Sequence, residues 1–136
     1  MLYLFEVLLY ANAICFVGFS IPPLPPCQFQ LGMQNDKLPD SALSSSSQYN
    51  GYAGPENARL HFYAEDGRYG AWVAQKQDHN QWLQVDFGVE AVITRIATQG
   101  RQDAAQWVKE YTLRYSTDGF YFKQYQPSGY TKVTFW

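Results

Sequence analysis

The stretch from Asn80 to Gly88 constrains the fold most strongly, because its side chains alternate with a period of two. Such alternation over a short run that ends at a glycine is typical of a half-buried strand in an antiparallel sheet. The stretch holds no nucleophile, metal-ligand cluster or phosphate-binding loop, so it indicates a fold before it indicates a function. The two alternating sets are Leu83, Val85 and Phe87 against Trp82, Gln84 and Asp86.

Three runs downstream of Gly88 also favour strands. They cover residues 92–98, which are rich in β-branched side chains, residues 108–115, which alternate cleanly, and residues 120–125. Asp118-Gly119 precedes the last run, and an Asp-Gly pair between alternating runs predicts a hairpin. Upstream, the serines 44–47 fit either a flexible linker or a strand edge, and residues 56–61, after Pro55, fit one short helical turn.

Composition supports a β-rich globular domain and argues against a nucleic-acid partner. Of the 136 residues, 46% are apolar and 18% are aromatic, and aromatic side chains favour pleated, half-buried surfaces. The formal charge is −2, and the lysines and arginines are scattered between Lys37 and Lys132 without a run that could follow a phosphate backbone.

The first 26 residues differ in composition from the rest of the chain. Residues 1–20 are mostly apolar and end in small residues, so we expect a secretory signal peptide cleaved after Ser20, although Glu6 stands where a basic residue is usual. The competing interpretation is an uncleaved membrane anchor, for which Glu6 and Asn12 are a poor match. A Pro-rich linker at 21–26 follows, and the predicted domain covers residues 27–136.

The two cysteines are Cys15, inside the expected signal peptide, and Cys27, which opens the predicted domain. In an oxidising compartment an unpaired Cys27 is either reactive, joined to another chain, or separated from a partner that the sequence does not contain.

Sequence blocks spread from Cys27 to about Tyr125 resemble the discoidin domain, also called the coagulation factor V/VIII type C domain. They occur in the family's order, and their agreement in register makes the resemblance specific. The blocks are Cys27 with Leu31-Gly32-Met33, Pro39-Asp40-Ser41, Ser44–Ser47, Ala58-Arg59-Leu60, Gly70-Ala71-Trp72, Gln81–Gly88, Ala97–Arg101, and Tyr111–Ser116 with Asp118-Gly119.

The resemblance implies an all-β, jelly-roll β-sandwich of about eight strands. It also implies a disulfide between Cys27 and a cysteine at the end of the domain. Because the chain stops at Trp136, we expect the last strands and the closing cysteine to be missing, which would leave the sandwich truncated at its C-terminal end.

The resemblance further implies ligand recognition by three loops at one end of the sandwich, matching residues 49–53, 64–69 and 101–105. Family members use such loops to bind cell-surface or matrix proteins, glycans, or membranes that carry phosphatidylserine, and most act in cell adhesion. The candidate ligand-binding residues are Tyr49, Asn50, Tyr52, Arg68, Tyr69, Arg101, Gln102 and Asp103. The loop tyrosines either fold back onto the sandwich or contact a ligand.

Three hypotheses follow for function. The first is a non-enzymatic adhesion module, either secreted or part of the extracellular portion of a membrane protein. The second is a peripheral binder of anionic phospholipid, although tyrosines stand where membrane-binding relatives carry tryptophans. The third is a glycan-binding appendage of a catalytic domain outside this sequence.

Catalytic, metal and cofactor sites have little support in the sequence. His61 and His79 lack neighbouring cysteines or an acidic cluster, and the scattered aspartates do not form a calcium-loop pattern. We therefore expect no metal and no cofactor. Arg59 and Asp86 are expected to form a structural polar pair inside the sandwich, because a charge among apolar residues needs a partner.

Overall fold

The computed structural model describes residues 5–10, 31–91, 93, 96–126 and 133–134, with side chains described for residues 31–91, 93 and 96–126. Across these ranges the regular structure consists of strands and two short 3₁₀ helices, η1 (Asp40–Ala42) and η2 (Pro55–Ala58). The predicted all-β fold class is confirmed. No helix in this part of the chain is long and apolar enough to cross a membrane.

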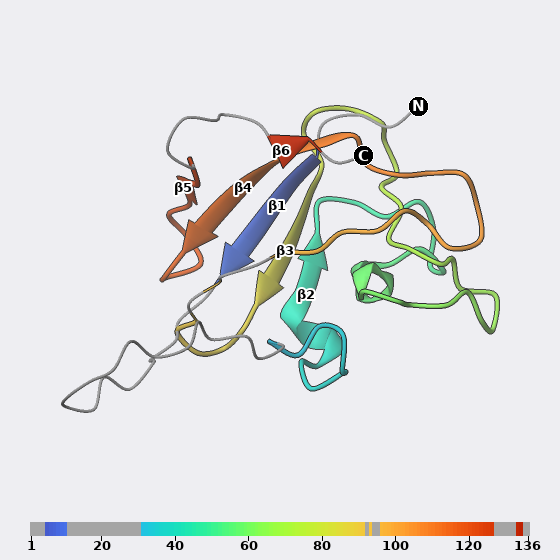
Figure 1. The fold of residues 1–136 in the computed structure, drawn as a ribbon, viewed down its shortest axis with the longest axis horizontal. Coiled ribbons are helices and arrows are strands. Elements are labelled where there is room, and N and C mark those ends of the chain that lie inside the picture. The colour runs from blue at the N-terminus through green and yellow to red at the C-terminus, as the bar shows by residue number, and fades with distance from the viewer. Residues whose placement is uncertain (1–4, 11–30, 92, 94–95, 127–132, 135–136) are drawn as a thin grey trace.

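The strands form one six-stranded sheet in the order β2-β3-β1-β4-β5, with β6 also paired to β4 (Figure 1). β1 lies in the middle, parallel to both β3 and β4, whereas β2, β5 and β6 pair antiparallel with their neighbours. The bounds are β1 (Phe5–Tyr10), β2 (Leu43–Ser45), β3 (Trp82–Asp86), β4 (Glu110–Ser116), β5 (Lys123–Gln124) and β6 (Val133–Thr134).

β3 confirms the strand predicted within residues 80–88. Its side chains alternate between buried and half-buried, with Leu83 and Val85 in the interior. Val85 stands opposite Leu43 of β2, which pairs with β3 as the serine run begins. The strand-edge interpretation of residues 44–47 is therefore confirmed for Ser44 and Ser45. The predicted single helical turn is η2, which begins at Pro55.

Two of the strand predictions need correction. In residues 92–98, the described positions 93 and 96–98 lie in no strand. Ile93 and Ile96 instead pack against the core as partly buried side chains. Apolar contact with the core therefore positions these two β-branched residues, and no strand pairing is needed. The hairpin after Ser116 is confirmed, but β5 has only two residues, because Asp118 accepts hydrogen bonds from the Phe120 and Tyr121 backbone N–H groups and extends the turn.

The core cluster joins the sheet to the segment before it. Its buried members are Leu38, Leu43, Val85 and Tyr111, with partly buried apolar side chains around them. Leu38 comes from the irregular segment before η1, while Tyr111 is the second residue of β4, so the core joins residues 31–42 to the sheet. This packing fixes the base from which the long connections before β3 and β4 extend.

The predicted polar pair of Arg59 with Asp86 is wrong in its partner. Arg59 is buried, as expected, but its Nη2 donates to Asp40 Oδ1 at 2.6 Å and to the Leu38 carbonyl at 2.7 Å. Asp36 lies 3.4 Å from its Nε. Asp86 accepts a hydrogen bond from the Gly88 backbone N–H instead. A buried guanidinium needs several acceptors, and the turn at residues 33–40 supplies them close by.

The N-terminal predictions are covered only in part by the described residues. Residues 5–10, within the expected signal peptide, are strand β1 at the centre of the sheet, and cleavage after Ser20 stays a prediction. Cys15, the linker 21–26 and Cys27 with its expected disulfide lie outside the described residues.

Val85 provides the test of this core. It is 3% exposed, so Val85→Ala removes buried methyl groups and leaves a cavity beside Leu43. We expect the free energy of unfolding to fall by about 2 kcal/mol, measured by urea denaturation followed by fluorescence. Val89→Ala is the matched control, because Val89 is 65% exposed and its substitution should change stability by less than about 0.5 kcal/mol. Equal effects at the two positions would contradict this core assignment.

Candidate functional site

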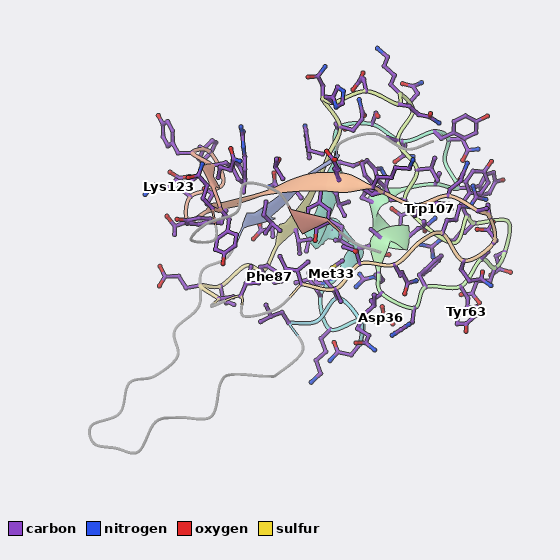
Figure 2. The ribbon with its side chains drawn as sticks, turned by 45° about the horizontal axis from the view of Figure 1, so that its top comes forward. Met33, Asp36, Tyr63, Phe87, Trp107 and Lys123 are labelled. Carbon is purple, nitrogen blue, oxygen red and sulfur yellow. The ribbon has the colours of Figure 1, made fainter. Side chains whose placement is uncertain are left out.

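The three loops predicted to bind ligand lie together on one side of the molecule. The green and orange segments that precede β3 and β4 meet there (Figure 1), and Tyr63 and Trp107 lie on this side, away from Lys123 (Figure 2). Backbone hydrogen bonds join the loops in sequence, from Tyr69 N–H to Tyr52 C=O at 2.8 Å and from Gln102 N–H to Gly70 C=O at 3.4 Å. We call residues 49–53, 64–70 and 101–106 together the loop platform.

A buried amide connects the first two loops. Asn57 of η2 is 1% exposed, and its Nδ2 donates to the carbonyl oxygens of Tyr52 at 2.8 Å and Tyr69 at 3.0 Å. Its Oδ1 accepts two hydrogen bonds from Arg68, from Nε at 3.0 Å and from Nη2 at 2.6 Å. Sequence reasoning missed Asn57, because nothing in Pro55–Ala58 distinguishes a buried asparagine from one on the surface of a turn.

Arg68 faces inward from its loop. Besides the two bonds to Asn57, its Nη2 lies 3.8 Å from Glu56 Oε1, and its guanidinium carbon lies 4.6 Å from the centre of the Phe62 ring. These contacts engage both its charge and its flat face. The geometry therefore indicates that Arg68 holds the second loop in place, while its predicted ligand contact stays a prediction.

Arg101 and Asp103 form a two-point contact within the third loop. Arg101 Nε lies 2.7 Å from Asp103 Oδ1, and its Nη2 lies 2.6 Å from Oδ2. The Arg101 guanidinium carbon lies 4.2 Å from the centre of the Tyr69 ring, and Nη1 donates to Gln106 Oε1. With its side chain only 15% exposed, Arg101 joins the third loop to the second.

Gly70 allows this close approach. Its N–H donates to Asp103 Oδ1 at 3.0 Å, and a Cβ at this position would lie 2.8 Å from the same oxygen. The same Cβ would lie 3.0 Å from Gln102 Cβ, so a larger residue requires the Asp103 carboxylate and Gln102 to shift. The second loop itself turns at Asp66 and Gly67, both with positive φ, and closes through the Arg68 N–H to Glu65 C=O bond, as in a type I′ turn.

The charged pair on the platform has shifted proton affinities. The hydrogen bond from Arg101 holds the pKa of Asp103 far below its ordinary value of 3.8, with a smaller contribution from the Gly70 N–H and some opposition from burial. The same hydrogen bond raises the pKa of Arg101. Asp103 is therefore a fixed negative charge already committed to Arg101, and it is poorly placed to serve as a proton donor or base.

The exposed aromatic surface of the platform comes from the first loop. Tyr49 is 57% exposed and Tyr52 is 56% exposed, so neither ring folds back into the interior. Tyr49 stacks on Tyr69 with ring centres 6.2 Å apart. Asn50 Nδ2 donates to the Tyr69 hydroxyl, and Asn50 Oδ1 accepts from the Tyr52 N–H, which fixes the loop that carries both exposed rings.

The eight predicted residues therefore separate by exposure and partners. Tyr49 and Tyr52 present open surface, whereas Arg101, Asp103 and Arg68 are engaged with one another or with neighbouring residues. Gln102 accepts a hydrogen bond from the Ala64 N–H through Oε1, which joins the third loop to the start of the second. Their roles in ligand binding stay predictions, and the geometry makes the two tyrosines the best placed for contact.

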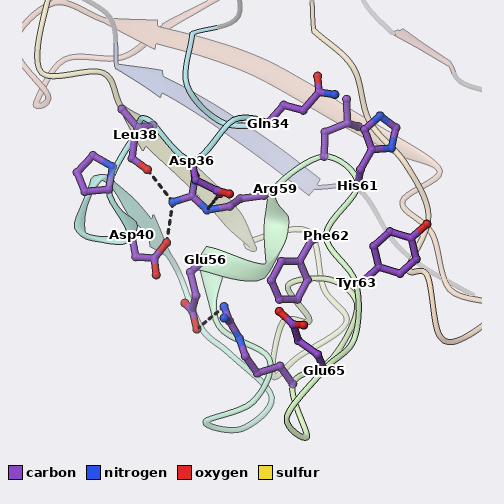
Figure 3. Close-up of a pocket in the computed structure, with 13 residues that line it drawn as sticks. Gln34, Asp36, Leu38, Asp40, Glu56, Arg59, His61, Phe62, Tyr63 and Glu65 are labelled. Atoms are coloured by element: carbon purple, nitrogen blue, oxygen red, sulfur yellow. Dashed lines mark hydrogen bonds and ion pairs between the residues drawn. The ribbon is translucent and has the colours of Figure 1, made fainter.

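A groove of about 700 Å³ lies beside the platform, between η2 and the segment around Asp36 (Figure 3). Its two arginines, Arg59 and Arg68, are each paired with acidic residues. Four carboxylates line it, so its charge balance is negative and does not favour anionic ligands. They are Asp36, Asp40, Glu56 and Glu65. Across the described residues, no group of three or more histidines, cysteines or acids could hold a metal ion.

A smaller cavity of about 120 Å³ lies behind the third loop. Trp72 and Trp107 line it together with the amide side chains of Gln77, Gln81, Gln99 and Gln106. Trp107 is 54% exposed, so this cavity opens to solvent over an aromatic side chain. Flat apolar rings next to amide donors and acceptors suit a small polar ligand that has an apolar face.

Comparisons with known proteins agree on one family. A model of the F5/8 type C domain matches residues 42–135. Lactadherin of Mus musculus is 36% identical over 115 residues, covering 79% of this chain and 24% of that protein. Lactadherin of Bos taurus is 37% identical over 110 residues, covering 76% of this chain and 25% of that protein. The discoidin domain-containing receptor tyrosine kinase B of Caenorhabditis elegans is 37% identical over 107 residues, covering 76% of this chain and 12% of that protein.

The chain thus spans about a quarter or less of the length of these relatives. No solved structure matches it.

The Arg101–Asp103 contact predicts how the platform responds to acid. Because the folded-state pKa of Asp103 lies below its unfolded value, the contact stabilises the platform fully above about pH 4 and is lost only as pH falls through the lowered pKa. The Gly70 amide, which donates to Asp103, reports this event by NMR. We expect its shift to stay constant from pH 7 down to about pH 4 and to change below that.

In Asp103→Asn the same amide should lose this titration, because the side chain no longer ionises. A Gly70 midpoint at or above the ordinary aspartate value in the unsubstituted chain would contradict the contact.

Proposed function

The chain belongs to the F5/8 type C, or discoidin, domain family, and we propose that it is a non-enzymatic extracellular ligand-binding module that mediates cell adhesion through its loop platform. The family fold is a β-sandwich, with which the strand-dominated structure agrees. One relative is named as a receptor, which supports an extracellular binding role.

The observation that carries the proposal is the pair of half-exposed tyrosines on a surface that is already organised. Tyr49 and Tyr52 keep more than half of their area in solvent, while Asn50, Asn57 and Tyr69 fix the backbone that carries them. A preformed surface loses little conformational entropy on binding, and tyrosine combines apolar area with a polar tip. Both properties suit recognition of a protein or glycan surface.

The electrostatics of the platform favour such a partner over an anionic lipid. Arg68 and Arg101 are held by Glu56 and Asp103, and the neighbouring groove carries an excess of carboxylates. Attraction to a membrane that carries phosphatidylserine depends on clustered cationic charge, which these pairs neutralise. Tyrosines also insert less apolar area into a bilayer than tryptophans do.

A glycan is the second candidate, and the small cavity behind the third loop favours it. Trp72, Trp107 and four glutamine side chains offer an aromatic face together with amide hydrogen-bonding groups. The cavity adjoins the platform through Arg101 and Gln106, which line it and also take part in the third-loop contacts. A sugar held there would lie next to the platform and could form part of one larger recognition surface.

Cell adhesion to the immobilised full-length chain tests the proposal. We expect the double variant Tyr49→Ala/Tyr52→Ala to need about tenfold more coated protein for half-maximal adhesion, because exposed aromatic contacts carry much of the energy of an interface. The circular dichroism spectrum should remain unchanged, since neither ring is buried. Tyr121→Ala is the matched control, because Tyr121 is 80% exposed in the turn before β5, away from the platform.

Competition then distinguishes the partners. Loss of adhesion after protease treatment of the cells indicates a protein partner, loss with free monosaccharides indicates a glycan, and loss with phosphatidylserine vesicles indicates lipid. Unchanged adhesion by the double variant, or an equal loss in Tyr121→Ala, would overturn the platform as the binding surface.

A further inference from the structure

The centre of the sheet is filled by β1, a strand from the start of the chain that is distant in sequence from both of its neighbours. β1 pairs in parallel with β3 from Glu6 to Tyr10 and with β4 from Phe5 to Tyr10 (Figure 1). In the sheet order, β1 separates β3 from β4, so it is the strand that connects the β2–β3 part of the sheet to the β4–β5 part. Without it, β3 and β4 would each present an open edge.

The sequence of β1 matches this place in its register. Phe5, Val7 and Leu9 are apolar. They stand opposite positions that include the interior residues of the flanking strands: Phe5 opposite Tyr111, Val7 opposite Leu83, and Leu9 opposite Val85. Of the alternate positions, Glu6 stands opposite the half-buried Trp82 and Thr112, whereas Tyr10 stands opposite the buried Ser116. A shift of one residue would move Val7 and Leu9 away from Leu83 and Val85, so this pairing favours the observed register.

No tight turn ties β1 to either neighbour. β1 ends at Tyr10, and its partners begin at Trp82 and Glu110, so both contacts join segments far apart in the sequence. The strand is therefore joined to its neighbours through its ladder pairing, as is a strand added from a separate peptide. Open edges on β3 and β4 would leave rows of unpaired backbone groups, which is costly and promotes aggregation.

We propose that the gap between β3 and β4 is a strand-accepting slot, and that its occupant is Phe5–Tyr10 of the same chain. These residues then serve as a structural strand of the folded domain, and they stay with it instead of leaving as part of a signal peptide. The slot recognises an extended segment with apolar residues at alternate positions, chiefly through backbone hydrogen bonds. This role is independent of the loop platform and of the proposed adhesion function.

A split chain tests whether the strand is held without a covalent link. A specific protease site is placed in the Pro-rich run 21–26, the full-length chain is folded and purified, and the site is then cut. We expect the N-terminal fragment to co-elute with the remainder in gel filtration and to separate only in denaturant. Separation under native conditions would overturn the proposal.

A proline substitution tests the ladder in the uncut chain. Leu8 stands opposite Gln84 and Arg114, and Leu8→Pro removes a backbone N–H that a central strand needs. We expect the amides of β3 and β4 to lose protection from hydrogen exchange by about tenfold, measured by mass spectrometry. Leu8→Val is the matched control, because it keeps the N–H and the β-propensity, and it should retain protection to within about threefold.

Two results would contradict the inference, and the second can be obtained even if Leu8→Pro does not fold. One is unchanged protection of β3 and β4 in a soluble Leu8→Pro chain. The other is a protein secreted from eukaryotic cells that begins after Ser20, as shown by N-terminal sequencing, with β3 and β4 protected as in the full chain.

Discussion

The loop platform depends on one buried polar group, the side-chain amide of Asn57. Loops that lack a strand ladder must satisfy their backbone carbonyls in another way, and Asn57 does this for Tyr52 and Tyr69 together. Its oxygen then holds Arg68, so one side chain orders the first loop, the second loop and a cation. Asp103 plays the corresponding part for the third loop, because it binds both Arg101 and the Gly70 N–H. Tyr49 and Tyr52 can remain exposed because these interior bonds fix the backbone beneath them.

The sheet supplies the base for this arrangement. β3 contributes Leu83 and Val85 to the interior, and the connections that precede β3 and β4 form the loops. Arg59 adds a second anchor, because it binds the turn at residues 33–40 and follows η2, which carries Asn57. Arg59 therefore connects the core segment around Leu38 to η2 and the loops beside it. We expect a substitution that displaces Leu38 to alter the position of the loops through Arg59.

Local patterns predicted the parts of this structure that repeat with a period of two. Residues 80–88, 108–115 and the Asp118-Gly119 turn were located correctly, because each carries its own signal in side-chain alternation or turn chemistry. Residues 92–98 carry the same β-branched signal, yet their described part lies in no strand, since a strand also needs a neighbour with free backbone groups. Sequence alone does not reveal which segment will find that neighbour, and β1 at the centre of the sheet is the clearest example.

The candidate site was predictable in its location and less so in its roles. The resemblance placed the three loops, and in the structure Tyr69 contacts both Tyr49 and Arg101. The resemblance did not distinguish the exposed loop residues from those that are bound to neighbours. The partners of Arg68 and Arg101 depend on how the loops lie in the folded structure, which the sequence pattern does not show. Asn57 and the steric requirement at Gly70 were missed for the same reason.

The central claim is that the exposed tyrosine face of the platform touches the ligand. Photo-crosslinking on living cells tests it most directly, with a photoreactive phenylalanine analogue placed at position 49, 52 or 121 of the full-length chain. We expect cross-linked cell-surface material from positions 49 and 52 and little from position 121, although Tyr121 is the most exposed of the three. Equal yields at all three positions, or yields confined to position 121, would contradict it.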